Sequence, residues 1–135
     1  MSSKFRSVLL AMLLCALGIA AYWQALRGYF LSDDFVHLLY MQRVDDDIYV
    51  LLKNFWSNWL DIPTTLFFRP LVSVTLYVDH LLWGWRPEGY HLTNIVIHAM
   101  NGVLIFLISR RLAGRGEAGG QIVFAFLGAM LFLVW

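Results

Sequence analysis

Charged side chains are scarce in this sequence of 135 residues: Asp, Glu, Lys and Arg make up 14% of it, against about 25% in a typical soluble domain. Hydrophobic residues make up 60%, which excludes an ordinary water-soluble globule and also a disordered chain. The net charge of +1 is too small for a nucleic-acid-binding surface, which needs a strong basic excess. A single cysteine, Cys15, cannot form an internal disulfide, so a disulfide scaffold is excluded as well. What remains is a membrane protein, with room for two or three helices of about 20 residues each.

Three apolar segments are long enough, or nearly long enough, to cross a bilayer. They cover about residues 8–31, 90–108 and 121–135. At about 1.5 Å per residue, the third segment covers only about 22 Å of a hydrocarbon core of about 30 Å. A stable membrane chain rarely stops inside a span. The third segment therefore predicts that these residues are the N-terminal part of a longer protein or the product of a truncated reading frame.

The first segment has a second interpretation, which is a cleaved signal peptide. A basic start with Lys4 and Arg6, an apolar centre and small residues such as Ala20 fit that pattern. Cleavage would leave a secreted or anchored binding module. The apolar segments that follow favour a retained span instead.

Positive charge predicts the orientation of the spans, because cytoplasmic loops carry an excess of Lys and Arg. Two basic residues precede the first span and three arginines follow the second: Lys4, Arg6, Arg110, Arg111 and Arg115. Both places are therefore expected on the cytoplasmic side, with residues 109–120 as a cytoplasmic loop. Residues 32–89 then form a long outer loop, and its eight acidic residues against four basic ones agree with that location.

The outer loop is predicted to contain two helices. Apolar residues recur at helical spacing over residues 47–61 and indicate an amphipathic helix on the membrane surface. The acidic residues 45–47 suit the N-cap and first turn of that helix. A second helix is expected at residues 71–83, which is too short to span. Both helices could equally serve only to cap a bundle.

Asp33 and Asp34 follow the first span directly, at the mouth of a membrane helix. Two carboxylates at that depth are costly to desolvate unless they have a partner or a task. Adjacent carboxylates tend to separate in pKa, and one of them can then serve as a general base. A solvated turn, or the N-cap of a following helix, explains the same residues without a function.

Arg69 lies in the sequence FRPL at residues 68–71, where the second surface helix is expected to begin. A guanidinium group at this place could hold a phosphate by bidentate hydrogen bonds. The alternative is an interfacial arginine that meets lipid headgroups.

A polar stripe runs along the second span. Its members share one helix face at the spacing i, i+3, i+7 and i+10: His91, Asn94, His98 and Asn101. Such a stripe usually faces the protein interior, where it either supports a site or joins helices. The two histidines are about two turns apart and lack the i, i+4 spacing of zinc hydrolases, so no metal site is predicted.

Taken in order, these features resemble the C-type membrane glycosyltransferases that use polyprenyl-phosphate sugars. The likeness is strongest for the branch that contains the transmembrane and tetratricopeptide-repeat protein O-mannosyltransferases and their bacterial relatives. That branch typically shows a DD pair in the first outer loop, an [FY]RPL element and a helix with the pattern G-[YF]-H-L-x-N-x-x-x-H. Here these are Asp33 with Asp34, residues 68–71, and the run from Gly89 to His98. The resemblance covers residues 5–135, and only the N-terminal part of such an enzyme.

The resemblance implies an all-α membrane fold within one glycosyltransferase domain. This fold has two full transmembrane helices, a truncated third, and amphipathic surface helices in the first outer loop. The location implied is multi-pass in a bacterial plasma membrane, with a cytoplasmic N-terminus. The partners implied are the bilayer, a polyprenyl-phosphate-sugar donor, a protein or glycan acceptor and the remaining helices of the enzyme, but not nucleic acid. Residues 1–135 alone are expected to be inactive, because a lipid-linked donor needs a groove lined by more helices.

The resemblance also implies roles for individual residues. In the family the first-loop Asp accepts the proton of the acceptor hydroxyl, so Asp33 or Asp34 is the candidate base, and Asp34 is favoured. Arg69, with His91 as a second candidate, would bind the donor phosphate, supported by Asn94 and His98. The cofactor stays open, because some relatives use a divalent cation and others do not. The competing interpretation is a small non-enzymatic membrane subunit whose third helix ends against a partner.

Overall fold

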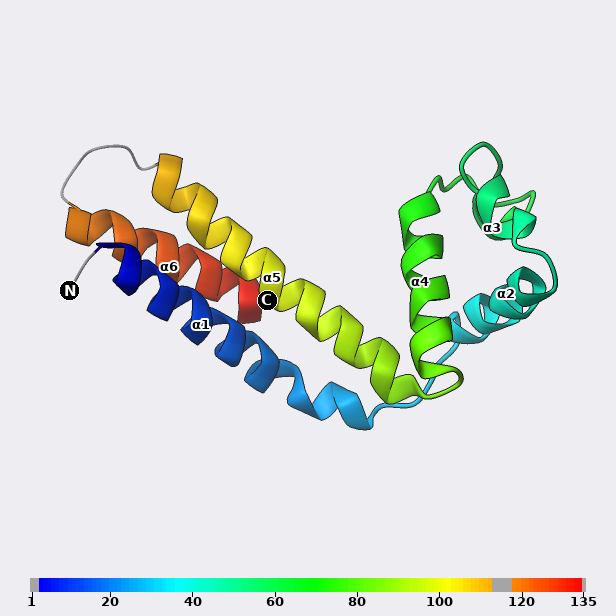
Figure 1. The fold of residues 1–135 in the computed structure, drawn as a ribbon, viewed down its shortest axis with the longest axis horizontal. Helices are drawn as coiled ribbons and strands as arrows, with labels where there is room; N and C mark the ends of the chain where they lie inside the picture. Colours follow the sequence, from blue (N-terminus) through cyan, green and yellow to red (C-terminus); the bar gives the residue numbers. More distant parts are fainter. Residues whose placement is uncertain (1–2, 113–117, 135) are drawn as a thin grey trace. The chain divides into compact units, whose positions relative to one another are not determined.

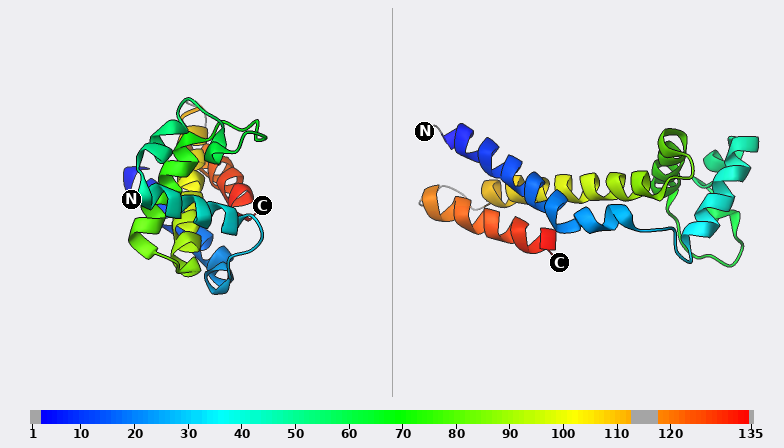
Figure 2. Two further views of the ribbon diagram at one scale, coloured as in Figure 1. Left: turned by 90° about the vertical axis from the view of Figure 1, so that its right-hand side faces the viewer. Right: turned by 90° about the horizontal axis from the view of Figure 1, so that it is seen from below.

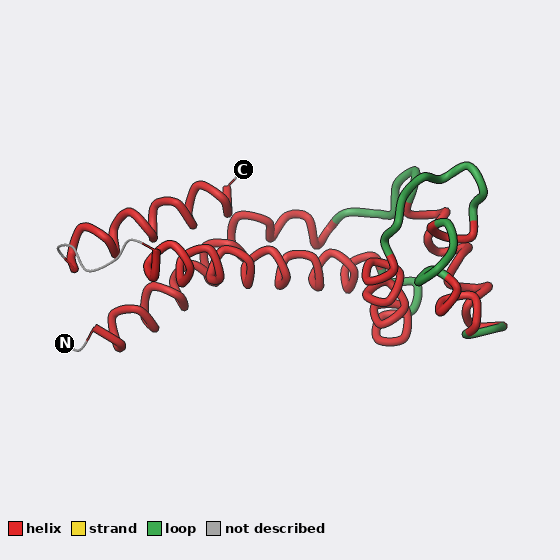
Figure 3. The backbone as a smooth tube through the Cα atoms, turned by 90° about the horizontal axis from the view of Figure 1, so that it is seen from above, coloured by secondary structure: helices red, strands yellow, loops and turns green. Residues whose placement is uncertain are grey.

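A computed structural model describes residues 3–112 and 118–134 and divides the chain into two compact units. We refer to Met1–Leu26 with Leu92–Trp135 as unit 1 and to Arg27–His91 as unit 2. Every regular element in the described ranges is a helix, as the tube in Figure 3 shows. Two helical stretches, Phe5–Arg27 and Pro87–Leu112, are long and apolar enough to cross a membrane. The predicted all-α membrane fold is therefore confirmed.

Unit 1 consists of three helices that lie side by side (Figures 1 and 2). They are α1 (Ser3–Tyr22), the part of α5 (Pro87–Leu112) that follows His91, and α6 (Ala118–Val134). α1 continues into a 3-10 turn, η1 (Trp23–Arg27). Buried side chains from all three helices form an apolar core: Leu14, Phe106, Ala125, Ala129 and Leu133.

Small residues allow these three helices to approach closely. Leu133 of α6 lies against both Gly18 of α1 and Gly102 of α5. A methyl group added at Gly102 would lie 2.6 Å from Cδ2 of Leu133, and one added at Gly18 would lie 3.2 Å from the same atom. A methyl carbon cannot approach another carbon to 2.6 Å, so the packing of Leu133 requires glycine at position 102.

The ends of the helical spans differ from those predicted. Helical structure after the first apolar segment stops at Arg27 rather than at residue 31, and α5 extends beyond residues 90–108 at both ends. The flanking residues explain the longer helix. Pro87 suits the first helical position, Glu88 suits the positive end of the helix dipole, and two arginines occupy the last turn.

Unit 2 contains short helices joined by turns. They are α2 (Asp34–Asp46), α3 (Tyr49–Lys53), the 3-10 turn η2 (Trp59–Asp61) and α4 (Pro70–Trp83), followed by the first residues of α5. Helices α2, α3 and α4 contact one another pairwise (Figure 1). Buried side chains of α2 and α3, with that of the residue after Trp59, form a second core: Tyr40, Met41, Val44, Leu51 and Leu60. Partly buried side chains of α4 pack against this core.

The predicted amphipathic helix over residues 47–61 is wrong. The helix in this region, α3, ends at Lys53, and the chain later passes through a left-handed residue, Leu60, with a φ of 57°. Hydrogen bonds of the Asn54 side chain replace the helical ladder. Its Nδ2 donates to the carbonyl oxygen of Leu51 at 3.3 Å, and its Oδ1 accepts the Leu60 N–H at 2.8 Å. Asparagine side chains compete with helices in this way.

The acidic run at residues 45–47 also has a different place from the one expected. Asp45 and Asp46 end α2, the helix that the sequence offered as one of two alternatives after Asp33 and Asp34, and Asp47 is its C-cap. Asp47 still stabilises the start of the next segment, since its Oδ1 accepts the backbone N–H of Tyr49 at 2.9 Å. The expected helix at residues 71–83 is confirmed as α4, with Pro70 as its first residue.

Candidate functional site

The acidic pair lies at the start of α2, in unit 2. Asp33 occupies the N-cap position and Asp34 is the first helical residue. Oδ2 of Asp34 accepts the backbone N–H of Leu31 at 2.9 Å, and Oδ1 of Asp33 accepts the Ser32 hydroxyl at 3.2 Å. Ser32 has a φ of 43°, a left-handed conformation that is uncommon for a residue with a Cβ. The two carboxylates are therefore held by a tight, strained turn rather than by a flexible loop.

His37 lies one helical turn after the acidic pair, and its ring packs against Trp59. The ring centroids are 5.1 Å apart. Nδ1 of His37 is buried and has no hydrogen-bond partner among the described residues. Burial lowers the pKa of the His37 imidazole below its ordinary value of 6.5, although the carboxylates of Asp34 and Asp33 act in the opposite direction. At neutral pH the ring is therefore uncharged and does not neutralise the acidic pair.

Arg69 also contacts the Trp59 ring. Its Cζ is 5.2 Å from the centroid of that ring and 4.5 Å from the centroid of the Phe67 ring. Such contacts hold a guanidinium by its faces and leave its N–H groups, which lie in the plane, directed outward. Within the described part of the chain, no carboxylate or other acceptor takes a hydrogen bond from the exposed Arg69 side chain. The arrangement is that of a cation fixed in place with its donors available to an anion.

Trp59 joins the two parts of this arrangement, because His37 and Arg69 both contact it. We call Asp33, Asp34, His37, Trp59 and Arg69 the acid–arginine site. Residues that are more than thirty positions apart in the sequence are brought together here by the turn that carries Trp59.

The structure does not place His91 beside Arg69. Arg69 directly precedes α4, whereas His91 follows the opposite end of that helix (Figure 1). A helix of 14 residues is about 21 Å long. His91, the second candidate for the donor phosphate, has a buried Nε2 without a partner in the described ranges.

The polar stripe on α5 is divided. In unit 1, the His98 ring stacks on Phe132 at 4.8 Å and meets the edge of Tyr22 at 5.1 Å, and its Nε2 lies 3.3 Å from the Leu133 carbonyl oxygen. His98 thus joins three helices. Asn94 and Asn101 have exposed side chains in the described structure. The buried core of unit 1 is mostly apolar, and its polar contacts include the partly buried His98 and the buried Ser7, which accepts a hydrogen bond from Arg110.

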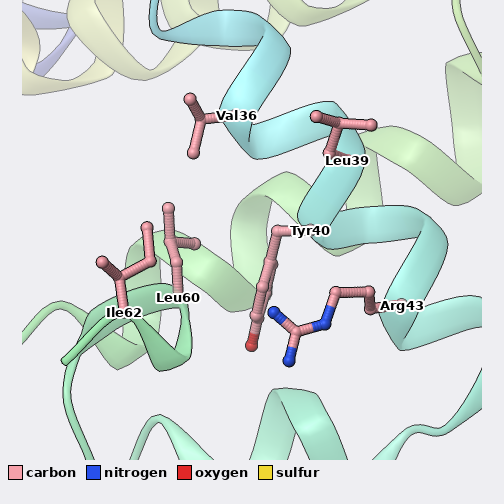
Figure 4. Close-up of a pocket in the computed structure, with 6 residues that line it drawn as sticks. All are labelled: Val36, Leu39, Tyr40, Arg43, Leu60 and Ile62. Carbon is pink, nitrogen blue, oxygen red and sulfur yellow. The ribbon is translucent and has the colours of Figure 1, made fainter.

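A small pocket lies on a neighbouring face of α2. Four residues at helical spacing on that helix face two residues of the following turn across it: Val36, Leu39, Tyr40, Arg43, Leu60 and Ile62 (Figure 4). In Figure 4 the guanidinium of Arg43 lies beside the hydroxyl end of Tyr40. The cavity has a volume of about 130 Å³, whereas ligand sites typically measure about 300–1,000 Å³. The pocket is therefore too small for a sugar phosphate.

Metal-binding groups do not gather in the described ranges: no three His, Cys, Asp or Glu side chains there lie close enough to hold an ion together. The chemistry considered below uses only the side chains of the acid–arginine site.

Comparison with known proteins identifies several relatives. Protein O-mannosyl-transferase TMTC2 of Mus musculus is 29% identical over 105 residues, which cover 75% of this chain and 13% of that protein. Protein O-mannosyl-transferase Tmtc1 of Drosophila melanogaster is 38% identical over 64 residues, or 46% of this chain and 8% of the relative. Protein O-mannosyl-transferase TMTC3 of Mus musculus is 30% identical over 95 residues, which cover 67% of this chain and 10% of that protein.

The homologues of this chain are the TMTC protein O-mannosyl-transferases. The family resemblance inferred from the sequence motifs is thereby confirmed. The chain spans only 13% or less of the length of these three relatives. No family model matches the sequence. No solved structure matches it either.

Two residues of this TMTC-related chain were missed by sequence reasoning, and a third was misplaced. His37 follows Asp33 and Asp34 at the helical spacings i+4 and i+3, so recognition of α2 would have placed it beside them. Trp59 was expected on a continuous surface helix and instead lies in a turn. No local pattern marks Asn54, because its partner Leu60 lies six residues further along.

Proposed function

We propose that the chain contributes to a membrane glycosyltransferase that moves a sugar from a polyprenyl-phosphate donor to an acceptor hydroxyl on a protein or glycan. The homologues support a glycosyltransferase, since their names describe protein O-mannosyl-transferases. The observation that carries the proposal is the acid–arginine site. The carboxylates lie one helical turn before His37, and His37 and the Arg69 guanidinium both contact the ring of Trp59 in the same unit.

The reaction requires a base for the acceptor and positive charge for the donor. The acceptor oxygen attacks the anomeric carbon of the sugar while its proton passes to a carboxylate. The bond from that carbon to the phosphate oxygen breaks, and the polyprenyl phosphate leaves with the electron pair. A fixed cation close to the phosphate stabilises the charge that develops there.

Asp34 is the favoured base within the acidic pair. Its side chain is half-buried, and the Leu31 N–H occupies one of its two oxygens, which leaves Oδ1 to accept the hydroxyl proton. Asp33 is exposed and bonded to its neighbour Ser32. Arg69 would bind the departing phosphate through its outward N–H groups, a geometry that suits bidentate contacts.

The experiment that tests this function replaces the acidic residues in the full chain that the gene encodes. Asp34→Asn is nearly isosteric but cannot accept the proton, so we expect transfer from polyprenyl-phosphate mannose to fall about 10²–10⁴-fold with membrane insertion unchanged. Asp33→Asn should lower the transfer activity by a smaller factor. The matched control is Asp46→Asn, an exposed aspartate at the other end of α2. Full activity in both Asp33→Asn and Asp34→Asn would show that the base lies elsewhere.

We further propose that the N-terminus and residues 109–120 are cytoplasmic and that residues 32–89 face outward, as the distribution of Lys and Arg favours. Cysteine placed at Ser57 or at Ala118, in a Cys15→Ser background, should react with an impermeant maleimide from opposite sides of the membrane. Labelling of both from the same side would contradict this topology. Residues 1–135 alone should not transfer sugar, because the donor groove needs further helices.

A further inference from the structure

Asn54 is a polar residue at the centre of unit 2. Its side chain is only 1% exposed. Oδ1 accepts the Leu60 N–H at 2.8 Å, while Nδ2 donates to the Tyr40 hydroxyl and lies 3.3 Å from the carbonyl oxygens of Val50 and Leu51. The Tyr40 hydroxyl in turn donates to the Val50 carbonyl at 2.8 Å. Both ends of the carboxamide are thus satisfied, and its orientation is fixed.

The residue that Asn54 holds has an unfavourable backbone. Leu60 has a φ of 57° and a ψ of 19°, a left-handed conformation in which the Cβ of any residue but glycine is crowded. Its side chain is buried, with 3% exposed. Such a conformation persists only where the surroundings determine it, and the Asn54 carboxamide supplies the hydrogen bond that does so.

Trp59 directly precedes Leu60, and both its backbone N–H and its backbone carbonyl form hydrogen bonds. Its N–H donates to the Phe67 carbonyl at 3.3 Å, and its carbonyl accepts the Ile62 N–H at 3.3 Å and the Thr65 hydroxyl at 3.0 Å. The turn at Leu60 sets the direction in which the indole leaves the backbone. The indole contacts both His37 and Arg69.

We propose that Asn54 is a positioning residue of the acid–arginine site, which holds the Leu60 turn and thereby keeps Trp59 in contact with His37 and Arg69. This role rests on the proposed function, since it serves catalysis only if the site does. Asn54 itself does not touch the site, so it acts through the backbone.

The fluorescence emission of Trp59 reports the position of its indole ring, and the measurement needs neither a sugar donor nor an acceptor substrate. This emission is obtained by subtracting the fluorescence of the Trp59→Phe variant from that of the full chain, with both proteins in detergent. A protonated imidazole quenches a neighbouring indole, so this emission should fall as the pH drops below 6.5, the ordinary pKa of histidine, and His37 becomes charged. Asn54→Ala should abolish at least half of that pH-dependent change, because the rings separate.

Two variants distinguish positioning from a general loss of structure. Asn58→Ala removes an exposed carboxamide in the same turn, whose Nδ2 donates to the Pro63 carbonyl at 3.2 Å. Tyr40→Phe removes a hydroxyl that contacts Asn54 but leaves the bond to Leu60 in place. Both should retain the pH-dependent emission. The proposal would be overturned if Asn54→Ala left the pH-dependent emission change unaltered. It would also be overturned if Tyr40→Phe reduced that change as much as Asn54→Ala does.

A glycine at position 60 gives a second test, in which Leu60→Gly rather than the unmodified chain is the reference. Glycine adopts a positive φ without crowding, so Leu60→Gly relieves the strained backbone that the Asn54 bond holds, but it also removes a buried leucine side chain. The double variant Asn54→Ala with Leu60→Gly should therefore match Leu60→Gly alone in Trp59 emission. If the double variant lost more of the pH-dependent Trp59 emission than Leu60→Gly alone, Asn54 would not act through the backbone of residue 60.

Transfer activity gives a second readout. With polyprenyl-phosphate mannose as the probe, Asn54→Ala should lower kcat/KM about 10- to 100-fold, mostly through KM for the donor, because Arg69 loses its support. The emission measurement stands apart from this assay. A failure of the proposed function, shown by full activity in both acidic-pair variants, therefore remains distinguishable from a failure of the Asn54 proposal.

Discussion

In unit 1 the buried side chains are mostly leucine, phenylalanine and alanine that meet across three long helices, with glycine at the points of closest approach. In unit 2 an asparagine and a tyrosine form a buried hydrogen-bonded group, and the helices are short. Unit 2 also contains both non-glycine residues with positive φ among those described, Ser32 and Leu60. Apolar packing dominates the described core of the first unit, whereas in the second a buried group of hydrogen bonds adds to an apolar core.

The difference between the units agrees with the site that we propose in unit 2. The described core of unit 1 is mostly apolar and holds its helices by packing. Strained backbone and buried polar groups are costly and persist where a particular geometry is required. In this chain they flank the acid–arginine site on both sides, at Ser32 beside the carboxylates and at Leu60 beside Trp59.

The largest effect expected in this comparison is a steric one in unit 1. Gly102→Ala places a methyl group 2.6 Å from Leu133 and should lower the free energy of unfolding in detergent by about 1–3 kcal/mol. Gly128→Ala in α6 is the matched control, since nothing lies within 4 Å of the added carbon; it should be neutral or stabilising by up to about 1 kcal/mol. Equal effects at both glycines would mean that close packing does not hold unit 1.

In unit 2, Arg69→Lys should raise KM for the lipid-phosphate donor about tenfold, with a smaller change in kcat. Lysine keeps the charge but lacks the planar fork and the stacking between Trp59 and Phe67. Arg86→Lys, at an exposed arginine between α4 and α5, should leave KM unchanged in steady-state assays. If both variants behaved alike, net charge rather than geometry would explain donor binding.

A smaller effect is expected where α2 meets α4. His80 Nε2 lies 2.7 Å from Asp45 Oδ2, but the Asp45 side chain is 46% exposed, so water weakens the attraction. Asp45→Asn should lower the stability of unit 2 by no more than about 1 kcal/mol in chemical unfolding. Asp46→Asn, one residue further, should change nothing. A loss well above that limit would show that this contact holds the two helices.

The smallest effect concerns the pH dependence of stability. Burial lowers the pKa of His37 in the folded state, so the unfolded chain binds more protons near the ordinary value of 6.5. The contribution of neutral His37 is therefore complete above pH 6.5 and is lost as the pH falls through the lower folded-state pKa. His37→Phe keeps a ring against Trp59 but cannot titrate. Its melting temperature should decline less between about pH 7 and about pH 5 than that of the unmodified chain; an equal decline would exclude His37 as the source.

The sequence by itself determined the features that depend on composition and on neighbouring residues. Low charge and long apolar segments predicted an all-α membrane protein, because burial in a bilayer depends on length and hydrophobicity alone. The start of α4 followed from Pro70, and the motifs around Asp33, Arg69 and His91 were sufficient to indicate the family.

Only the tertiary structure decided how the site is assembled. The periodic pattern over residues 47–61 favoured one helix, but Asn54 bonds to Leu60 and Tyr40 instead and turns the chain. That turn brings Trp59 to His37 and Arg69, and it leaves His91 at the far end of α4. Local periodicity carries no information about a side chain that bonds to a backbone six residues away and to a different helix. The free-energy cost of the left-handed backbone at Leu60 is offset by contacts that exist only once α2, α3 and the turn have packed together.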